Sequence, residues 1–228
     1  MADEPAVVLD GLERRYGDRT ALAGVSLTLA AGETLAVFGA NGAGKTTLLR
    51  ILATLLRPHA GGARVLGREL PREGWAVRGR IGLLAHEPLL YRELSGRENL
   101  AFHARLHGVE EMRVAEVLGA VGLAGRAEEP VRTLSRGMTQ RLAICRAILH
   151  SPELLLLDEP HANLDPAAVE QVAPLIGRAS GRTRVLISHD VEGGLGDADL
   201  VLGLREGRPA LLAPAAEVSA RELRELYR

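Results

Sequence analysis

The stretch 38-FGANGAGKTTLLRIL-52 decides how the rest of this sequence is interpreted. Residues 39–46 match the pattern G-x-x-x-x-G-K-[ST], in which glycines let backbone N–H groups point at phosphate oxygens. The stretch follows an apolar strand predicted over 34–38 and opens a helix predicted over 46–56, which Pro58 is expected to end. This is the context of a phosphate-binding loop, because a helix N-terminus adds partial positive charge beside the anion.

Lys45 is the only lysine among the 28 Lys and Arg residues of the chain. We predict that it contacts the β- and γ-phosphates of a nucleotide as a compact charge, which the planar guanidinium of Arg does not replace. The hydroxyl of Thr46 is predicted to bind Mg²⁺. GTPases usually read guanine through N-K-x-D, and a chain without a second lysine lacks that signal.

Strand and helix patterns alternate along the chain. Apolar or alternating runs predict strands over 25–29, 153–157 and 183–188. Helical patterns lie at 97–106, 114–121 and 138–149. Strands that alternate with helices favour a parallel α/β sheet. Residues from about 88 to 150 carry helical patterns without a convincing strand, so we expect a helical subdomain inserted into the α/β core.

The composition is that of a globular protein. The chain has 228 residues, of which 46% are hydrophobic and 25% charged, and its net charge of −1 offers no broad basic surface for nucleic acid. A single cysteine, Cys145, excludes an internal disulfide framework. No apolar run approaches the ~20 residues of a membrane helix, and residues 1–10 lack the apolar segment of a secretory signal. We therefore expect a cytoplasmic protein that meets a membrane only through a partner.

Two carboxylates end the predicted strand in 154-LLLLDE-159. Beside a phosphate loop, Asp158 can hold the Mg²⁺ shell, and Glu159 can polarise the water that attacks the γ-phosphate. Upstream, 134-LSRGM-138 precedes a helical pattern, where a serine and a glycine at a helix start form another anion site. Taken alone, that segment is no stronger a signal than a helix N-cap.

Together these motifs resemble the nucleotide-binding subunit of ATP-binding-cassette (ABC) transporters over essentially the whole chain. The order matches: Tyr16, the phosphate loop, a mid-chain switch loop, the signature segment LSRGM, the Asp-Glu strand and His189. The resemblance implies an α/β fold: a P-loop NTPase core of RecA-like type with a mostly parallel sheet, an antiparallel β subdomain and the helical insertion. It also implies one nucleotide-binding domain over 1–228 and ATP hydrolysis with ATP and Mg²⁺ as ligands.

The resemblance also implies roles for individual residues. Tyr16 would stack on adenine, His189 would contact the γ-phosphate, and Asp165 would lie in a loop that crosses a dimer interface. Lys45, Glu159 and His189 would be the catalytic residues. The expected nucleotide-binding residues are Tyr16, Gly39, Ala40, Asn41, Gly42, Ala43, Gly44, Lys45, Thr46, Thr47, Ser135, Gly137 and Asp165. The expected Mg²⁺ ligands are Thr46, Asp158 and His86.

The family implies a head-to-tail dimer, made with a second copy or a paired ABC subunit. Each ATP would lie between the phosphate loop of one subunit and the signature segment of the other. The Ser135 hydroxyl and the Gly137 backbone would then touch the γ-phosphate held by the partner. Closure would desolvate the phosphates, and hydrolysis would reopen the dimer.

Three segments depart from the commonest family pattern: the signature, the switch loop and the loop after the Asp-Glu strand. The signature is usually LSGGQ, whereas this chain has Arg136 and Met138, and Met138 cannot donate the hydrogen bonds of Gln. His86 stands where a glutamine usually follows the switch-loop strand, and its imidazole can still reach Mg²⁺ or water. His161 stands where an aromatic or small residue is more usual, and we expect it to pack at an interface.

The resemblance implies an integral membrane permease subunit that docks beside the switch loop, from His86 to Asn99, with Tyr91 and Leu94 as apolar contacts. Alternatively, this segment only packs the helical subdomain on the core. LSRGM, the switch-loop histidine and residues 91–109 resemble haem-exporter subunits of cytochrome c maturation, and short drug or multidrug efflux ATPases carry similar segments. We predict a subunit on the cytoplasmic face of the cell membrane that powers export, of haem-exporter type, with drug efflux as the first alternative.

Two further classes remain open: a non-transport ABC ATPase of translation or DNA repair, and a regulatory module that binds ATP without turnover. The first usually has two cassettes or a long coiled coil, which this chain lacks, and Glu159 and His189 argue against the second. His103 and His107 are expected to be a partly exposed pair on a helix rather than haem ligands. Residues 214–228 are expected to form a terminal helix packed on the same domain.

Overall fold

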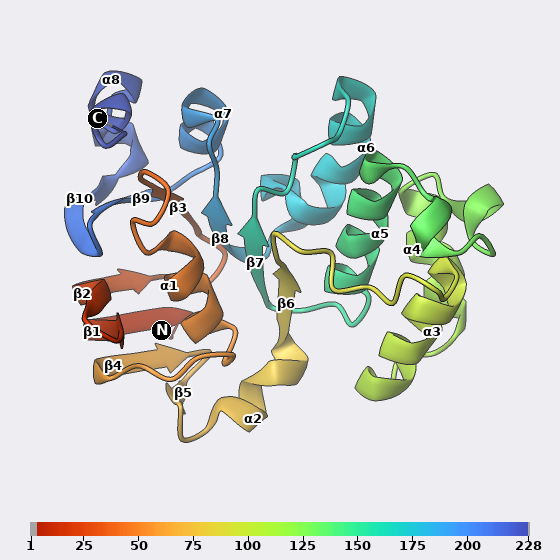
Figure 1. Cartoon of the computed structure of the whole chain (residues 1–228), viewed down its shortest axis with the longest axis horizontal. Coiled ribbons are helices and arrows are strands. Elements are labelled where there is room, and N and C mark those ends of the chain that lie inside the picture. The colour runs from red at the N-terminus through yellow and green to blue at the C-terminus, as the bar shows by residue number, and fades with distance from the viewer. Residues whose placement is uncertain (1–3, 228) are drawn as a thin grey trace.

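Residues 4–227 are described by a computed structural model, so what we expect of residues 1–3 and 228 lies outside the described residues. The larger sheet consists of β3 (Thr34–Phe38), β6 (Ile81–Leu84), β7 (Leu154–Asp158), β8 (Thr183–Ile187), β9 (Leu200–Arg205) and β10 (Arg208–Pro214). Its strand order is β10-β9-β3-β8-β7-β6 (Figure 1). Every neighbouring pair is parallel except β9 with β10, which confirms the predicted mostly parallel sheet.

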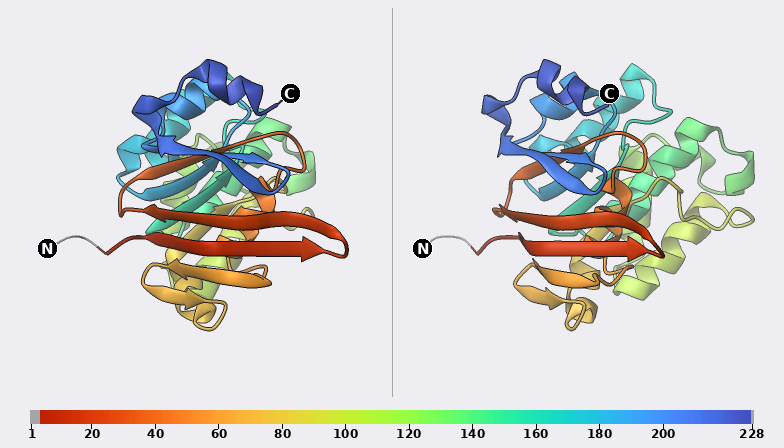
Figure 2. Two further views of the ribbon diagram at one scale, coloured as in Figure 1. Left: turned by 90° about the vertical axis from the view of Figure 1, so that its left-hand side faces the viewer. Right: turned by 60° about the vertical axis from the view of Figure 1, so that its left-hand side comes forward.

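The second sheet is antiparallel, as the fold class predicted. It consists of β1 (Val7–Tyr16), β2 (Arg19–Leu29), β4 (Ala60–Val65) and β5 (Arg68–Leu70), in the order β2-β1-β4-β5. Viewed from the end of the molecule that carries this sheet, β1 and β2 run across the front with β4 beside them (Figure 2). In β2, Val25, Leu27 and Leu29 are buried while Ser26 and Thr28 are exposed, so the predicted alternation is confirmed.

The central strands position the functional loops. All residues of β3, β7 and β8 are buried, as expected for parallel strands covered on both faces. The strands predicted over 153–157 and 183–188 agree with β7 and β8 to within one residue at each end. Because β3, β7 and β8 are parallel neighbours, their carboxyl ends meet at one edge of the sheet, where ligands bind in open α/β sheets.

The helix after the phosphate loop, α1 (Lys45–Leu52), is shorter than predicted. The chain leaves the helix at Ala53, and Thr54 takes a left-handed backbone conformation with φ of 62°. The N–H groups of Leu55 and Leu56 donate to the carbonyl of Arg50 and close the turn. The prediction that Pro58 ends the helix is therefore wrong, because the turn is complete before the proline.

In chain order, the helices α3 (Gly96–His107), α4 (Met112–Ala120) and α5 (Arg136–Ile148) follow β6 and precede β7. In space, they lie at the opposite end of the molecule from the antiparallel sheet (Figure 1). Ser95 and Glu98 form a capping box at the start of α3, and Gly108 ends it in a left-handed conformation. The apolar faces of these helices form a second hydrophobic cluster, which includes Leu100, Leu118 and Leu142. The predicted helical insertion is thus present in the fold.

The remaining α-helices are α2 (Gly74–Val77), α6 (Pro166–Ile176), α7 (Val191–Gly196) and α8 (Ala220–Glu225). Residues 208–214 belong to β10, and only Ala220–Glu225 form the α-helix near the C-terminus, so the helix predicted over 214–228 is too long. Leu223 and Leu226 pack against Phe38 and Val201 of the core, as expected for a helix that folds onto its own domain. None of the helices in residues 4–227 has the length and apolarity needed to cross a membrane.

Candidate nucleotide-binding site

The phosphate loop joins β3 to α1 and has three glycines with positive φ: 143° at Gly39, 81° at Gly42 and 109° at Gly44. A Cβ atom at Gly39 would lie 2.2 Å from the carbonyl oxygen of Leu204, and one at Gly44 would lie 2.3 Å from that of Ala21. Other residues would be strained and would clash with the backbone at both positions. The glycines are therefore required for the loop to curl between β2 and β9.

Lys45 is only 7% exposed, at the first position of α1. Its Nζ donates hydrogen bonds to the carbonyl oxygens of Gly39, at 2.5 Å, and Ala40, at 3.1 Å. Burial lowers the pKa of the ammonium, and the carboxylates of Asp158 and Glu159 oppose that shift. The loop therefore encloses a single positive charge that faces two carboxylates.

Asp158 and Thr46 meet where β7 ends beside α1. The Thr46 hydroxyl donates to Oδ2 of Asp158 at 3.3 Å, and Asp158 is 5% exposed. Burial and the neighbouring Glu159 raise the pKa of the Asp158 carboxyl. Hydroxyl and carboxylate oxygens are the ligands that Mg²⁺ prefers, and a cation here would relieve the buried negative charge, so the donor set fits the metal. Among residues 4–227, no cluster of three or more His, Cys, Asp or Glu side chains could hold a metal alone, so phosphate oxygens and water would complete such a shell.

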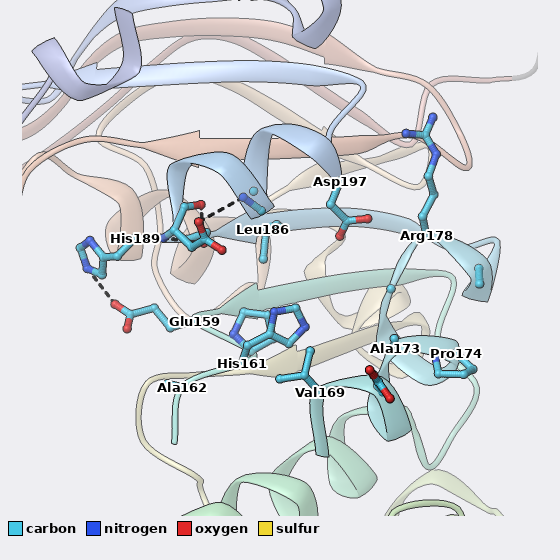
Figure 3. A pocket seen from close by; sticks show the side chains of 18 residues that line it. Glu159, His161, Ala162, Val169, Ala173, Pro174, Arg178, Leu186, His189 and Asp197 are labelled. Carbon is cyan, nitrogen blue, oxygen red and sulfur yellow. Dashed lines mark hydrogen bonds and ion pairs between the residues drawn. The ribbon is translucent and has the colours of Figure 1, made fainter. Parts of the chain in front are cut away.

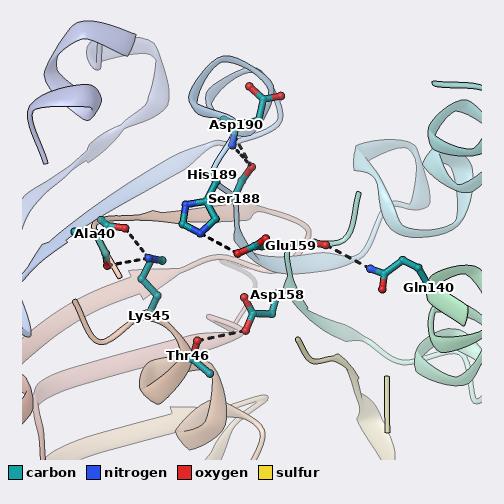
Figure 4. A network of polar contacts seen from close by, with 10 residues as sticks. Ala40, Lys45, Thr46, Gln140, Asp158, Glu159, Ser188, His189 and Asp190 are labelled. Carbon is teal, nitrogen blue, oxygen red and sulfur yellow. Dashed lines mark hydrogen bonds and ion pairs between the residues drawn. The ribbon is translucent and has the colours of Figure 1, made fainter. Parts of the chain in front are cut away.

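Glu159 and His189 form a pair at the ends of β7 and β8. Nε2 of His189 lies 2.9 Å from Oε1 of Glu159, and both side chains are partly exposed (Figure 4). Glu159 has a left-handed backbone conformation with φ of 51°, which is uncommon for a residue with a Cβ atom. Strained backbone of this kind concentrates at functional sites.

A cleft of about 450 Å³ unites these groups and falls within the size range of small-molecule pockets. Of the expected site residues, it is lined by Tyr16, Asn41, Gly42, Gly44, Lys45, Thr46, Thr47, His86, Asp158, Glu159 and His189. Tyr16 stands at the end of β1 with 44% of its surface exposed, and the guanidinium of Arg14 lies 4.9 Å from its ring centroid. Arg19 also lines the cleft and donates to the Gly42 carbonyl at 3.0 Å. No sequence pattern indicated a role for Arg19, because only the fold places β2 beside the phosphate loop.

Six expected residues do not line this cleft. Gly39, Ala40 and Ala43 belong to the phosphate loop that forms its wall, whereas the other three lie at the starts of α5 and α6. Ser135 caps α5, and its hydroxyl accepts a hydrogen bond from the Met138 N–H at 3.2 Å. Gly137 lies against the backbone carbonyl of Asn163, where an added Cβ would approach to 2.9 Å. Asp165 caps α6 and accepts from the Ala168 N–H at 2.8 Å. The nucleotide contacts expected of Ser135, Gly137 and Asp165 stay predictions.

A larger cleft of about 710 Å³ adjoins Glu159 and His189, between α6 and α7 (Figure 3). His161 lines it together with Val169 of α6 and Arg178. Sequence reasoning missed this cavity, because its walls come from segments on both sides of β8.

The loop between β3 and α1, the buried lysine and the strand-end carboxylates define a P-loop ATPase. The family model described as ABC transporter matches residues 22–162, and the chain therefore belongs to the ABC transporter family as one of its ATPases. It resembles an ATP-binding subunit of an ABC transporter with a TM-score of 0.87 and 26% identity, over 97% of this chain and 99% of that one. It also resembles a dimeric ATP-binding cassette in a post-hydrolysis state bound to ADP and Pi, with a TM-score of 0.83 and 25% identity over 92% and 98% of the two chains.

Curated relatives differ in the cargo that their names state. The daunorubicin resistance ATP-binding protein DrrA3 of Streptomyces coeruleorubidus is 42% identical over 96% of this chain and 71% of its own length. The cytochrome c biogenesis ATP-binding export protein CcmA of Methylococcus capsulatus is 40% identical over 85% of this chain and 96% of its own. The phosphonates import ATP-binding protein PhnC of Anaeromyxobacter dehalogenans is 40% identical, and the match spans about half of its length, 49%. The family is therefore shared, whereas the cargo is not.

Proposed function

We propose that this chain is the ATP-hydrolysing subunit of an ABC exporter, held on the cytoplasmic face of the cell membrane by an integral membrane permease. The observation that carries the proposal is the 2.9 Å Glu159–His189 pair, which lies in the same cleft as Lys45 and Asp158. A module that only binds nucleotide needs the loop and the lysine but not a carboxylate held by a histidine.

Each side chain has a distinct task in hydrolysis. Lys45 neutralises charge on the β- and γ-phosphates and leaves its loop carbonyls to do so. Glu159 accepts a hydrogen bond from the attacking water and orients it in line with the γ-phosphate, while His189 fixes the carboxylate. Thr46, Asp158 and His86 would hold Mg²⁺, which would supply charge neutralisation for the phosphate oxygens. Tyr16 provides the ring on which adenine stacks.

We propose that the site is completed by a second subunit in a head-to-tail dimer. Ser135 and Gly137 lie outside the cleft of their own chain, at the start of α5, where backbone N–H groups favour an anion. They are thus available to the nucleotide of a partner, with Asp165 at the same interface. We propose that residues 1–228 form one nucleotide-binding domain that includes a helical subdomain at about 88–150.

The permease is proposed to dock near residues 86–99. Tyr91 is 55% exposed, Leu89 46% and Leu94 36%, so this segment presents more apolar surface than a solvated loop needs. The Asn99 side chain fixes the segment, because Oδ1 accepts from the Tyr91 N–H at 2.8 Å and Nδ2 donates to the Tyr91 carbonyl at 3.0 Å. A cavity of about 540 Å³ beside Leu90 and Arg136 continues the same face, so docking there would move both the switch loop and the signature segment.

The cargo is proposed to be haem or a related precursor of cytochrome c maturation, on the basis of LSRGM, His86 and the likeness to CcmA. Drug efflux is the second candidate, since the likeness to DrrA3 extends over 96% of the chain. Purification from native membranes tests both. A polytopic partner that co-purifies with a haem absorbance band supports the first, and a partner whose ATPase rate rises with added anthracycline but not with haem supports the second.

Turnover is tested on the purified chain. Wild-type protein is expected to hydrolyse ATP slowly in the presence of Mg²⁺, and Glu159→Gln is expected to abolish hydrolysis while ATP still binds. Tight ATP binding by the wild type without any phosphate release, alone or with its membrane partner, would show a binding module instead.

A further inference from the structure

Gln140 is a buried polar residue of α5 for which the catalytic scheme above has no role. Gln140 is 9% exposed, and its side chain extends from α5 to the end of β7. Its Nε2 donates to the carbonyl oxygen of Pro160 at 3.1 Å and lies 3.4 Å from that of Glu159 (Figure 4). One amide therefore holds the two carbonyl groups that follow the catalytic carboxylate.

The backbone at Glu159 needs such support. Its φ of 51° is unfavourable for a residue with a Cβ atom, and a strained conformation persists only when its surroundings fix it. On one side, the Glu159 N–H donates to the carbonyl of Ile187 in β8 at 3.0 Å. On the other side, the Glu159 carbonyl accepts from the Ala162 N–H at 3.1 Å and from the Gln140 amide at 3.4 Å, and the same amide also holds the next carbonyl, that of Pro160. These contacts together fix the peptide from which the Glu159 side chain reaches His189, and the Gln140 amide is the side-chain donor among them.

The contact also connects Glu159 to the start of α5, because Gln140 lies on that helix. Gln140 follows Ser135, the N-cap of α5, by five residues, so both belong to the first turns of one rigid helix. In the proposed dimer, Ser135 touches the nucleotide of the partner, whereas Glu159 acts on the nucleotide of its own chain. A shift of the start of α5 would therefore move the Gln140 amide, which contacts the Glu159 carbonyl.

We propose that Gln140 is a positioning residue that orients Glu159 and couples it to the signature segment of the same chain. Engagement of Ser135 by the nucleotide of one subunit thereby sets the hydrolytic geometry in the other site. The inference rests on the proposed function, because it requires two composite sites. Within a single chain, the proposal makes a simpler claim: the amide donor aligns Glu159 and is not needed for nucleotide binding.

The test compares Gln140→Met with wild type. Methionine keeps the length of the side chain and removes the donor. We expect kcat for ATP to fall about tenfold, the loss typical of one well-placed hydrogen bond, while the Kd for ATP stays within about twofold. We also expect the Hill coefficient for ATP to fall toward 1. Gln171→Met, the same change at an exposed glutamine of α6, is the matched control and should leave all three values unchanged.

Gln140→Glu provides a second test with a pH signature. An ionised carboxylate only accepts hydrogen bonds and would repel the two carbonyls, whereas its protonated form can donate to the Pro160 oxygen. The kcat of Gln140→Glu relative to wild type should therefore rise as the pH falls from 8 to 6. This kcat ratio tests the role of Gln140 even if the methionine variant fails to fold.

These experiments distinguish a failure of the proposed function from a failure of the role of Gln140. Absence of hydrolysis by the wild type contradicts the proposed function. Hydrolysis by the wild type with unchanged kcat in Gln140→Met, or a kcat ratio for Gln140→Glu that is flat with pH, overturns the role of Gln140 alone. A loss of ATP affinity that parallels the loss of kcat would also overturn it, because it would mean that the amide only supports the fold.

Discussion

Acidification from pH 7.5 to 5.5 should destabilise this protein through histidines in its helical subdomain. His103 and His107 lie on α3, the first half-buried and the second exposed, as the sequence predicted for a partly exposed pair. The ring of His107 stacks on that of His150 with centroids 4.0 Å apart, and Arg146 donates to the Leu83 carbonyl at 2.7 Å. Burial lowers the pKa of His103 and of His150 to about 4, and the nearby cationic Arg146 adds to both shifts. The pKa of His107 is lowered by the same causes.

The sign and the size follow from linkage. A histidine whose folded pKa is below its unfolded value of 6.5 binds more protons when unfolded, so its contribution to stability is present above pH 6.5 and is lost as the pH falls toward the folded pKa. With a folded pKa of about 4, each of His103 and His150 lowers the free energy of unfolding at pH 5.5 by about 1–2 kcal/mol. Together they remove about 3 kcal/mol, a large share of a typical domain stability.

Urea denaturation at the two pH values measures this loss. The matched variant is His103→Leu with His150→Gln, in which neither side chain titrates and the glutamine amide can still donate to the Ile81 carbonyl that His150 contacts at 3.0 Å. We expect the variant to lose at least about 2 kcal/mol less than the wild type on acidification. Equal free energies of unfolding of the wild type at both pH values, or the same acid loss in the variant, would refute the reasoning.

Three further changes have definite expected results. Gly39→Ala places a Cβ 2.2 Å from the Leu204 carbonyl oxygen and should abolish binding of a fluorescent ATP analogue; binding within about twofold of wild type would contradict the loop geometry. Asp197→Ala removes the carboxylate that pairs with Arg184, which is 1% exposed, at 2.5 Å; the free energy of unfolding in urea should fall by about 3–5 kcal/mol, and a loss below about 1 kcal/mol would mean that the pair is solvated. Tyr91→Ser on the exposed docking segment should reduce co-purification of the membrane partner while the ATPase rate of the isolated chain stays unchanged, and full retention of the partner would place docking elsewhere.

Local patterns in the sequence specified the phosphate loop and its strand. The pattern over 39–46, the apolar run before it and the only lysine of the chain together indicated a phosphate site, and the structure places Lys45 buried in that loop. The buried strands β7 and β8 were predictable for the same reason, since continuous apolar runs followed by polar residues are typical of parallel central strands.

Contacts between distant segments were not predictable. Gln140 reads as one more polar residue of a helix, and only the packing of α5 against the end of β7 brings it to Pro160. The C-terminal end of α1 was predicted wrongly, because Thr54 adopts the left-handed conformation that a glycine usually has at a helix end. The helical spacing over 214–228 was likewise misleading in its first part, because β10 ends at Pro214, residues 215–217 form a separate 3₁₀ turn, and the α-helix starts only after its N-cap, Ser219.

The most direct test of the central claim is sedimentation velocity of Glu159→Gln with and without Mg-ATP, which measures whether nucleotide joins two copies. The account predicts a monomer without nucleotide, a dimer with Mg-ATP, and a monomer in both conditions once Lys45→Ala or Ser135→Arg is added. A chain that binds ATP with full affinity yet stays monomeric, or a dimer that forms equally well with Ser135→Arg, would contradict it.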